Sequence, residues 1–79
     1  MLFDGIDYVV QHETPFAGNP ERVLVWAGDE SLVATAIIDH NMEQIHVDYE
    51  GFGLESASYN YFEYSDPEEL ASWMVATSY

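Results

Sequence analysis

Hydrophobic and polar residues alternate most clearly between Gln44 and Glu50. The apolar members of this segment are Ile45, Val47 and Tyr49, and the residues between them are polar. Successive side chains of a β-strand point to opposite faces, so the pattern predicts a strand with one buried and one exposed face.

Runs of β-forming residues predict further strands of an antiparallel sheet. They cover residues 6–12, 22–27, 32–38 and 55–64. The short connector at residues 39–43 predicts a hairpin between 32–38 and the alternating segment. Two prolines, a glycine and an asparagine predict a loop at residues 13–20, although the chain before residue 20 also admits a helix.

The run at 55–64 is aromatic on both of its expected faces. Strict alternation would place Tyr59 and Tyr61 on one face, and Asn60, Phe62 and Tyr64 on the other. These rings would belong either to the core or to an interface, where tyrosine is enriched.

Residues 65–77 carry the start signal and the apolar stripe of a helix. Ser65 and Asp66 offer an N-cap, Pro67 suits the first helical position, and Glu69 stands at capping-box distance from Asp66. The apolar stripe expected to face the sheet consists of Leu70, Trp73, Met74 and Thr77. We therefore expect one α+β domain over residues 1–79, with an antiparallel sheet of four to five strands and one C-terminal helix packed on one face.

The charge of the chain is far from balanced. Its 79 residues include 15 Asp and Glu, no lysine and a single arginine, Arg22, which gives a formal net charge of −14. Small domains ordinarily carry a net charge of magnitude about 2–8, and self-repulsion at higher values opposes compaction. Arg22 is therefore a candidate to bridge several carboxylates. The acidity disfavours nucleic acid and anionic membranes as partners, and favours a basic protein surface, a cation or high salt.

Aromatic residues make up 15% of the chain, which argues against an acidic disordered tail. The chain has no cysteine, no uninterrupted apolar segment of membrane-spanning length and no basic signal-peptide region at its N-terminus. We therefore expect a cytoplasmic protein.

Catalytic and metal-binding signatures are weak. His40 adjoins Asp39, but no nucleophile motif or glycine-rich phosphate loop accompanies them, so we expect no enzyme, no catalytic residue and no cofactor. His46, Asp48 and Glu50 share the polar face of one predicted strand. Consecutive residues on a strand face diverge too far to chelate one ion without help, so we expect no metal site there.

Three features together resemble the small acidic inhibitors encoded by phages, which include DNA-mimic and anti-CRISPR proteins. They are the length of the chain, the nearly unopposed acids at positions 29–69, and a short antiparallel sheet closed by the acid-capped helix at 65–73. Fourteen negative charges match those on about 24 Å of duplex DNA. The resemblance implies that the protein blocks a nucleic-acid-binding machine by occupying its Lys/Arg-lined channel or recognition surface.

We therefore expect a phage or mobile-element inhibitor that binds and occludes a basic nucleic-acid-binding host protein, such as a CRISPR effector, in the host cytoplasm. It would be a monomer or weak homodimer and would contact neither nucleic acid nor membrane directly. The expected partner-binding acids are Asp29, Glu30, Asp39, Glu43, Asp48, Glu50, Glu55 and Glu63. Two other interpretations stay open: a halophile domain that is acidic for salt adaptation, and an acidic partner-binding subunit of a cellular complex.

Overall fold

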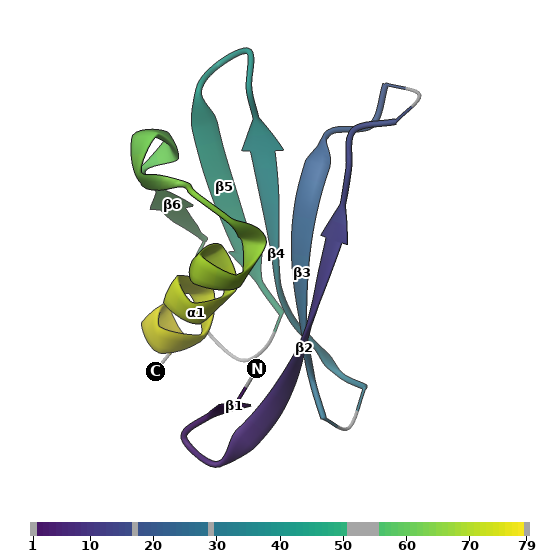
Figure 1. The fold of residues 1–79 in the computed structure, drawn as a ribbon, viewed down its shortest axis with the longest axis vertical. Coiled ribbons are helices and arrows are strands. Elements are labelled where there is room, and N and C mark those ends of the chain that lie inside the picture. Colours follow the sequence, from purple (N-terminus) through teal and green to yellow (C-terminus); the bar gives the residue numbers. More distant parts are fainter. Residues whose placement is uncertain (1, 17, 29, 51–55, 79) are drawn as a thin grey trace.

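The computed structural model describes residues 2–16, 18–28, 30–50 and 56–78. They form a six-stranded antiparallel sheet in which every strand pairs with its neighbours along the chain, followed by one C-terminal α-helix (Figure 1). The elements are β1 (Leu2–Phe3), β2 (Ile6–Glu13), β3 (Glu21–Ala27), β4 (Leu32–Asp39), β5 (Gln44–Tyr49), β6 (Ala57–Tyr59), the 3-10 helix η1 (Tyr61–Glu63) and α1 (Pro67–Thr77). The α+β class and the single C-terminal helix are confirmed.

The predicted β4–β5 hairpin is confirmed with little change. Asp39 pairs with Gln44, which leaves a connector of residues 40–43. Ile45 and Val47 are buried, whereas Gln44 and His46 between and beside them are exposed. The alternation in β5 therefore separates the core from the opposite face as expected.

The additional strand is β1, which extends the sheet beyond the four to five strands expected. Asp4 and Gly5 connect β1 to β2, and both have positive φ values of 50° and 79°. Asp-Gly is a favoured pair for a two-residue hairpin turn, because both central positions require left-handed backbone. The described residues before position 20 form β1, β2 and a loop, so the alternative of a helix there is wrong.

The strand expected at 55–64 is much shorter than predicted. β6 ends at Tyr59, and the Asn60 side chain accepts a hydrogen bond of 3.1 Å from the backbone N–H of Phe62. Such local side-chain bonds compete with the strand ladder, and here they begin η1. The alternating faces predicted for Tyr61, Phe62 and Tyr64 are therefore wrong.

Helix α1 begins where the sequence predicts, and Asp66 is its N-cap. The Asp66 carboxylate accepts a 2.8 Å hydrogen bond from the backbone N–H of Glu69. Of the predicted stripe, Leu70 and Met74 are fully buried, whereas Trp73 is half-buried and Thr77 is exposed. The buried face is completed by Ala71 and Val75, so it is centred about one position away from the expected stripe.

The helix covers only one face of the sheet, which we call the inner face (Figure 1). Its core contacts come from Val23, Val25, Ala34, Ala36, Ile38, Ile45 and Val47 on the strands. The Tyr49 hydroxyl donates to the carbonyl oxygen of Met74 over 3.1 Å, and the rings of Tyr59 and Trp73 meet edge to face at 5.2 Å. These two contacts link α1 to the neighbouring strands β5 and β6.

Neither helix in the described ranges is long and apolar enough to cross a bilayer.

Candidate functional site

The opposite, outer face of the sheet is covered by no element among the described residues (Figure 1). The strand register aligns its side chains in cross-strand rows. One row runs Glu13, Arg22, Ile37, His46; a second runs Gln11, Leu24, Thr35, Asp48; and Val9 opposite Trp26 begins a third. The central strands place polar Arg22 and Thr35 beside Ile37 and the buried Leu24, whereas Val9 and Trp26 form an apolar patch at one end of this face. The carboxylates of Glu13 and Asp48 lie toward its margins.

The only fixed cation of the chain lies on this face and is already engaged. Arg22 Nη2 forms an ion pair with Glu13 Oε1, its direct partner across β2 and β3. Arg22 was expected to bridge several carboxylates, but among the described residues the structure shows an ion pair with Glu13. Arg22 is the only lysine or arginine of the chain, so no second such side chain is present to pair with the remaining acids.

The acids expected to bind a partner are not gathered in one place. Asp39 and Glu43 lie at the β4–β5 hairpin, while Glu30 and Glu50 lie near the start of β4 at the other end of the strands. Asp48 lies on the outer face between these ends. Glu63 belongs to η1, and Asp29 and Glu55 lie outside the described residues.

Two of these acids have a local structural role. Asp39 Oδ1 accepts the backbone N–H groups of Asn41 and Met42, each over 3.0 Å, and so holds the hairpin turn. Asp48 Oδ1 accepts the Ser56 hydroxyl over 2.8 Å and lies 3.1 Å from His46 Nε2. Glu30, Glu43 and Glu50 are exposed, and the first two have positive φ values of 68° and 54°.

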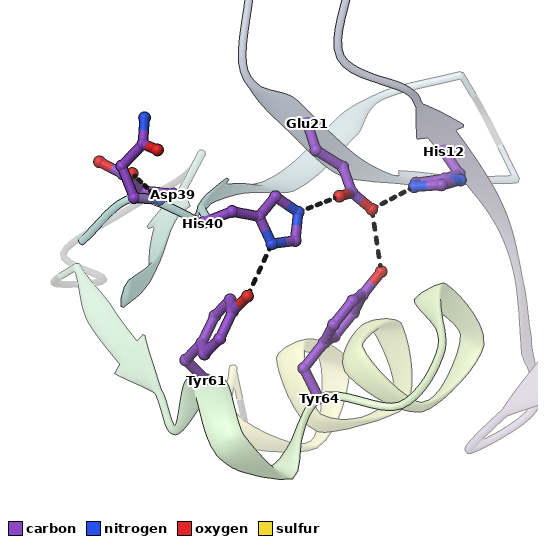
Figure 2. A network of polar contacts seen from close by, with 7 residues as sticks. His12, Glu21, Asp39, His40, Tyr61 and Tyr64 are labelled. Carbon is purple, nitrogen blue, oxygen red and sulfur yellow. Dashed lines mark hydrogen bonds and ion pairs between the residues drawn. The ribbon is translucent and has the colours of Figure 1, made fainter. Parts of the chain in front are cut away.

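A network of polar side chains lies at the hairpin end of the inner face (Figure 2). Glu21, at the start of β3, has a side chain only 11% exposed, and its carboxylate lies between two imidazoles. His12 Nε2 is 2.6 Å from one of its oxygens, and His40 Nε2 is 2.5 Å from the other. From the other side, the Tyr64 hydroxyl donates to Glu21 over 3.3 Å, and the Tyr61 hydroxyl lies 2.8 Å from His40 Nδ1.

The charges in this network follow from its hydrogen bonds. Burial opposes ionisation of Glu21, but hydrogen bonds from His40 and His12 and the attraction of their charges outweigh it, so the pKa of Glu21 lies below its ordinary value. An ionised carboxylate only accepts, so both imidazoles donate Nε2–H to Glu21. Burial, reinforced by the charge of Glu21, raises the pKa of Tyr64 to about 12. The network ties β2, β3 and the β4–β5 hairpin to η1 and the segment after it.

The chemistry open to this network is limited by its geometry. Figure 2 shows the two imidazoles on opposite sides of the Glu21 carboxylate, so their nitrogens do not converge on one point. Over the ranges that the structure describes, no group of three His, Cys, Asp or Glu side chains is arranged to hold a metal ion, and this covers His46 with Asp48. We assign the network a structural role.

No family model matches this chain, and neither curated proteins nor solved structures give a significant match.

Sequence reasoning did not single out Glu21 or the outer-face side chain of Trp26. Glu21, His12 and His40 come from three separate strand ends, and only their register brings them together. Residues 22–27 are apolar at almost every position, so their sequence alone does not say which side chains face α1. The sequence did indicate that a loop with asparagine and prolines connects the strands that carry His12 and Glu21. That signal does not predict how close the two side chains lie.

Proposed function

We propose that this protein is an inhibitor of phage or mobile-element origin that binds a basic nucleic-acid-binding host protein and occludes it. The observation that supports the proposal is the outer face of the sheet. It combines an exposed apolar patch, formed by Val9 and Trp26, with the carboxylates of Asp48 and Glu50, in a chain whose single arginine is already paired with Glu13.

An apolar centre with a polar margin is the usual anatomy of a protein interface. The sign of the charge determines the kind of partner, because surfaces of opposite potential attract and like potentials repel. A channel lined by lysine and arginine that normally holds nucleic acid offers the opposite charge and a surface large enough to form such an interface. The inhibitor acts by occupying this channel in the host cytoplasm, and no chemical step is involved.

Competition with DNA tests this function. Fluorescein-labelled duplex is bound to an RNA-guided nuclease, a restriction endonuclease and a histone-like protein, and release of the duplex is followed by anisotropy as the inhibitor is added. We expect release from at least one of them, with the apparent affinity falling about tenfold or more between 0.05 and 0.3 M NaCl as charges are screened.

Matched double variants locate the effect on the molecule. Asp48→Asn with Glu50→Gln removes two charges from the outer face and its margin, and should weaken the competition. Glu68→Gln with Glu69→Gln removes the same charge from the first turn of α1, and should weaken it less. Competition that persists with nanomolar affinity near 1 M NaCl contradicts the electrostatic mechanism.

A further inference from the structure

The outer face contains a hollow with a defined composition. The hollow has a volume of about 510 Å³ and is lined by Val9, Trp26, Ala27, Gly28 and Glu30. Val9 is 58% exposed and lies directly opposite Trp26 in the strand register, so together they form an apolar surface that no described element covers.

The aromatic wall of the hollow is held in place. The indole N–H of Trp26 donates to Gln11 Oε1 over 3.1 Å, which restricts rotation of the ring on the sheet surface. A fixed, partly exposed aromatic side chain is a good anchor for binding, because little conformational entropy remains to be lost.

Glu30, the acidic residue that lines the hollow, belongs to a hydrogen-bonded turn. The Glu30 N–H donates to the Ala27 carbonyl over 2.9 Å, and the Ala27 N–H donates to the Ser31 carbonyl over 2.8 Å. Glu30 adopts a left-handed backbone with φ of 68°, which few non-glycine residues do. The turn therefore holds an acidic residue beside the indole.

A hollow lined by both a tryptophan and a glutamate is suited to a cationic side chain. Cations bind most strongly to tryptophan among the aromatic residues, and a planar, weakly hydrated guanidinium can stack on the ring while it pairs with a carboxylate. The ammonium of lysine can pair with the carboxylate, but it is not planar and cannot stack on the ring in the same way. The chemistry of the hollow therefore favours arginine over lysine.

We propose that this hollow receives an arginine side chain of the basic partner, with the guanidinium stacked on Trp26 and paired with Glu30. The inference rests on the proposed function and names the residue type that the partner contributes. A second copy of the chain is a poor source, because its one arginine is already paired with Glu13 and its net charge is −14. Glu30 likewise repels the phosphates of nucleic acids.

The direct test uses N-acetyl-arginine amide as the probe and the indole N–H resonance of Trp26 as the readout. The two tryptophan indole resonances are assigned with a Trp26→Phe variant. We expect the Trp26 resonance to shift and saturate with the probe, while that of Trp73, which lies on α1, does not. N-acetyl-citrulline amide, which has nearly the same shape without the charge, should leave both unchanged.

Glu30→Gln and Glu50→Gln form a matched pair, because both replace an exposed acid at the same end of the sheet and remove one charge. Glu30→Gln should weaken arginine binding roughly two- to fivefold, the factor associated with one exposed ion pair, and Glu50→Gln should not. Equal shifts with citrulline, or unchanged affinity in Glu30→Gln, overturn the proposal. If the Trp26 resonance shifts with rising protein concentration in the absence of the probe, the hollow binds a second copy of the chain, and the proposal is overturned.

The DNA competition separates this inference from the proposed function. If the wild-type protein releases DNA and Glu30→Gln does so equally well, the function stands and the arginine site is wrong. If arginine binds at Trp26 but no salt-sensitive release of DNA occurs, the site chemistry stands and the nucleic-acid-binding target is wrong.

Discussion

Glu21 is the residue whose environment differs most from that of an ordinary acid in this chain. Its carboxylate accepts hydrogen bonds from two imidazoles and a tyrosine hydroxyl, while most of its side chain is buried. In a chain with so few cations, histidines supply the donors that arginine or lysine would supply elsewhere. The stability that Glu21 contributes should therefore depend on pH.

Glu21→Gln should lower the free energy of unfolding by about 1–3 kcal/mol at pH 7, because it replaces a largely buried charged acceptor that holds two partly exposed imidazoles. The pKa of Glu21 is lower in the folded protein than its ordinary value of 4.5. Its contribution is therefore present above that value and is lost as the pH falls through the folded pKa. Urea unfolding of both proteins, at neutral pH and again near pH 3, measures the difference.

The exposed acid Glu50 provides the control for this experiment. Glu50→Gln should change stability by no more than about 0.5 kcal/mol, the range usual for surface substitutions, at either pH. A difference between wild type and Glu21→Gln that stays constant from neutral pH to pH 3 would show that the ionised carboxylate is not what stabilises the network.

At the scale of elements, the start of α1 is where the sequence leaves two candidates and the structure selects one. Both Ser65 and Asp66 are good N-cap residues, but the bond to the Glu69 N–H comes from Asp66. Asp66→Ala should therefore destabilise the protein by about 1 kcal/mol, whereas Asp66→Asn should retain most of the cap. Ser65→Ala should be nearly neutral, and urea unfolding of the three variants checks the assignment; a larger loss for Ser65→Ala than for Asp66→Ala would reverse it.

The elements that the sequence predicts well are those whose local signals agree with their packing. β5 alternates and has one buried face, and α1 has a capping residue, a proline and a buried apolar stripe. The predicted length of β6 is wrong because the Asn60 side chain bonds to the backbone two residues ahead and ends the strand. A count of β-forming residues does not detect this local bond. β1 is missed because two residues are too few for a periodic pattern, although Asp4-Gly5 is a recognisable turn.

The candidate site is less predictable than the elements that carry it. Glu30 is an expected contact residue from its charge alone, but its position beside Trp26 depends on the β2–β3 register and on a shift in register between Val25 and Trp26. A run that is apolar on both faces contains no information about which face a helix will cover. Tertiary pairing supplies that information here, since α1 packs against Val23 and Val25 and leaves Leu24 and Trp26 on the other side.

At the scale of the whole molecule, the net charge of −14 is confined to a body of 36 × 22 × 22 Å. Charges at opposite ends interact in dilute buffer, where the Debye length is about 30 Å at 0.01 M salt, but hardly at 0.15 M, where it is about 8 Å. The acids at the two ends of the strands therefore repel one another mainly at low ionic strength.

We expect the protein to unfold cooperatively in dilute buffer, because its aromatic and aliphatic core is complete without salt. The midpoint of thermal unfolding should rise mostly between about 0.01 and 0.15 M KCl and change little above that, as screening of self-repulsion requires. Circular dichroism melts over a KCl series measure this. Glu43→Gln with Glu63→Gln, which removes two exposed charges, should show a smaller rise.

The same series distinguishes partner binding from salt adaptation as the reason for the acidity. A domain adapted to molar salt should be unfolded or weakly stable in dilute buffer and should gain stability up to molar KCl. A protein whose acids serve a basic partner needs only enough salt to weaken repulsion among its own carboxylates. A midpoint that keeps rising steeply beyond about 0.5 M KCl, several times the concentration at which the Debye length falls below 10 Å, would therefore favour the halophile interpretation over the inhibitor.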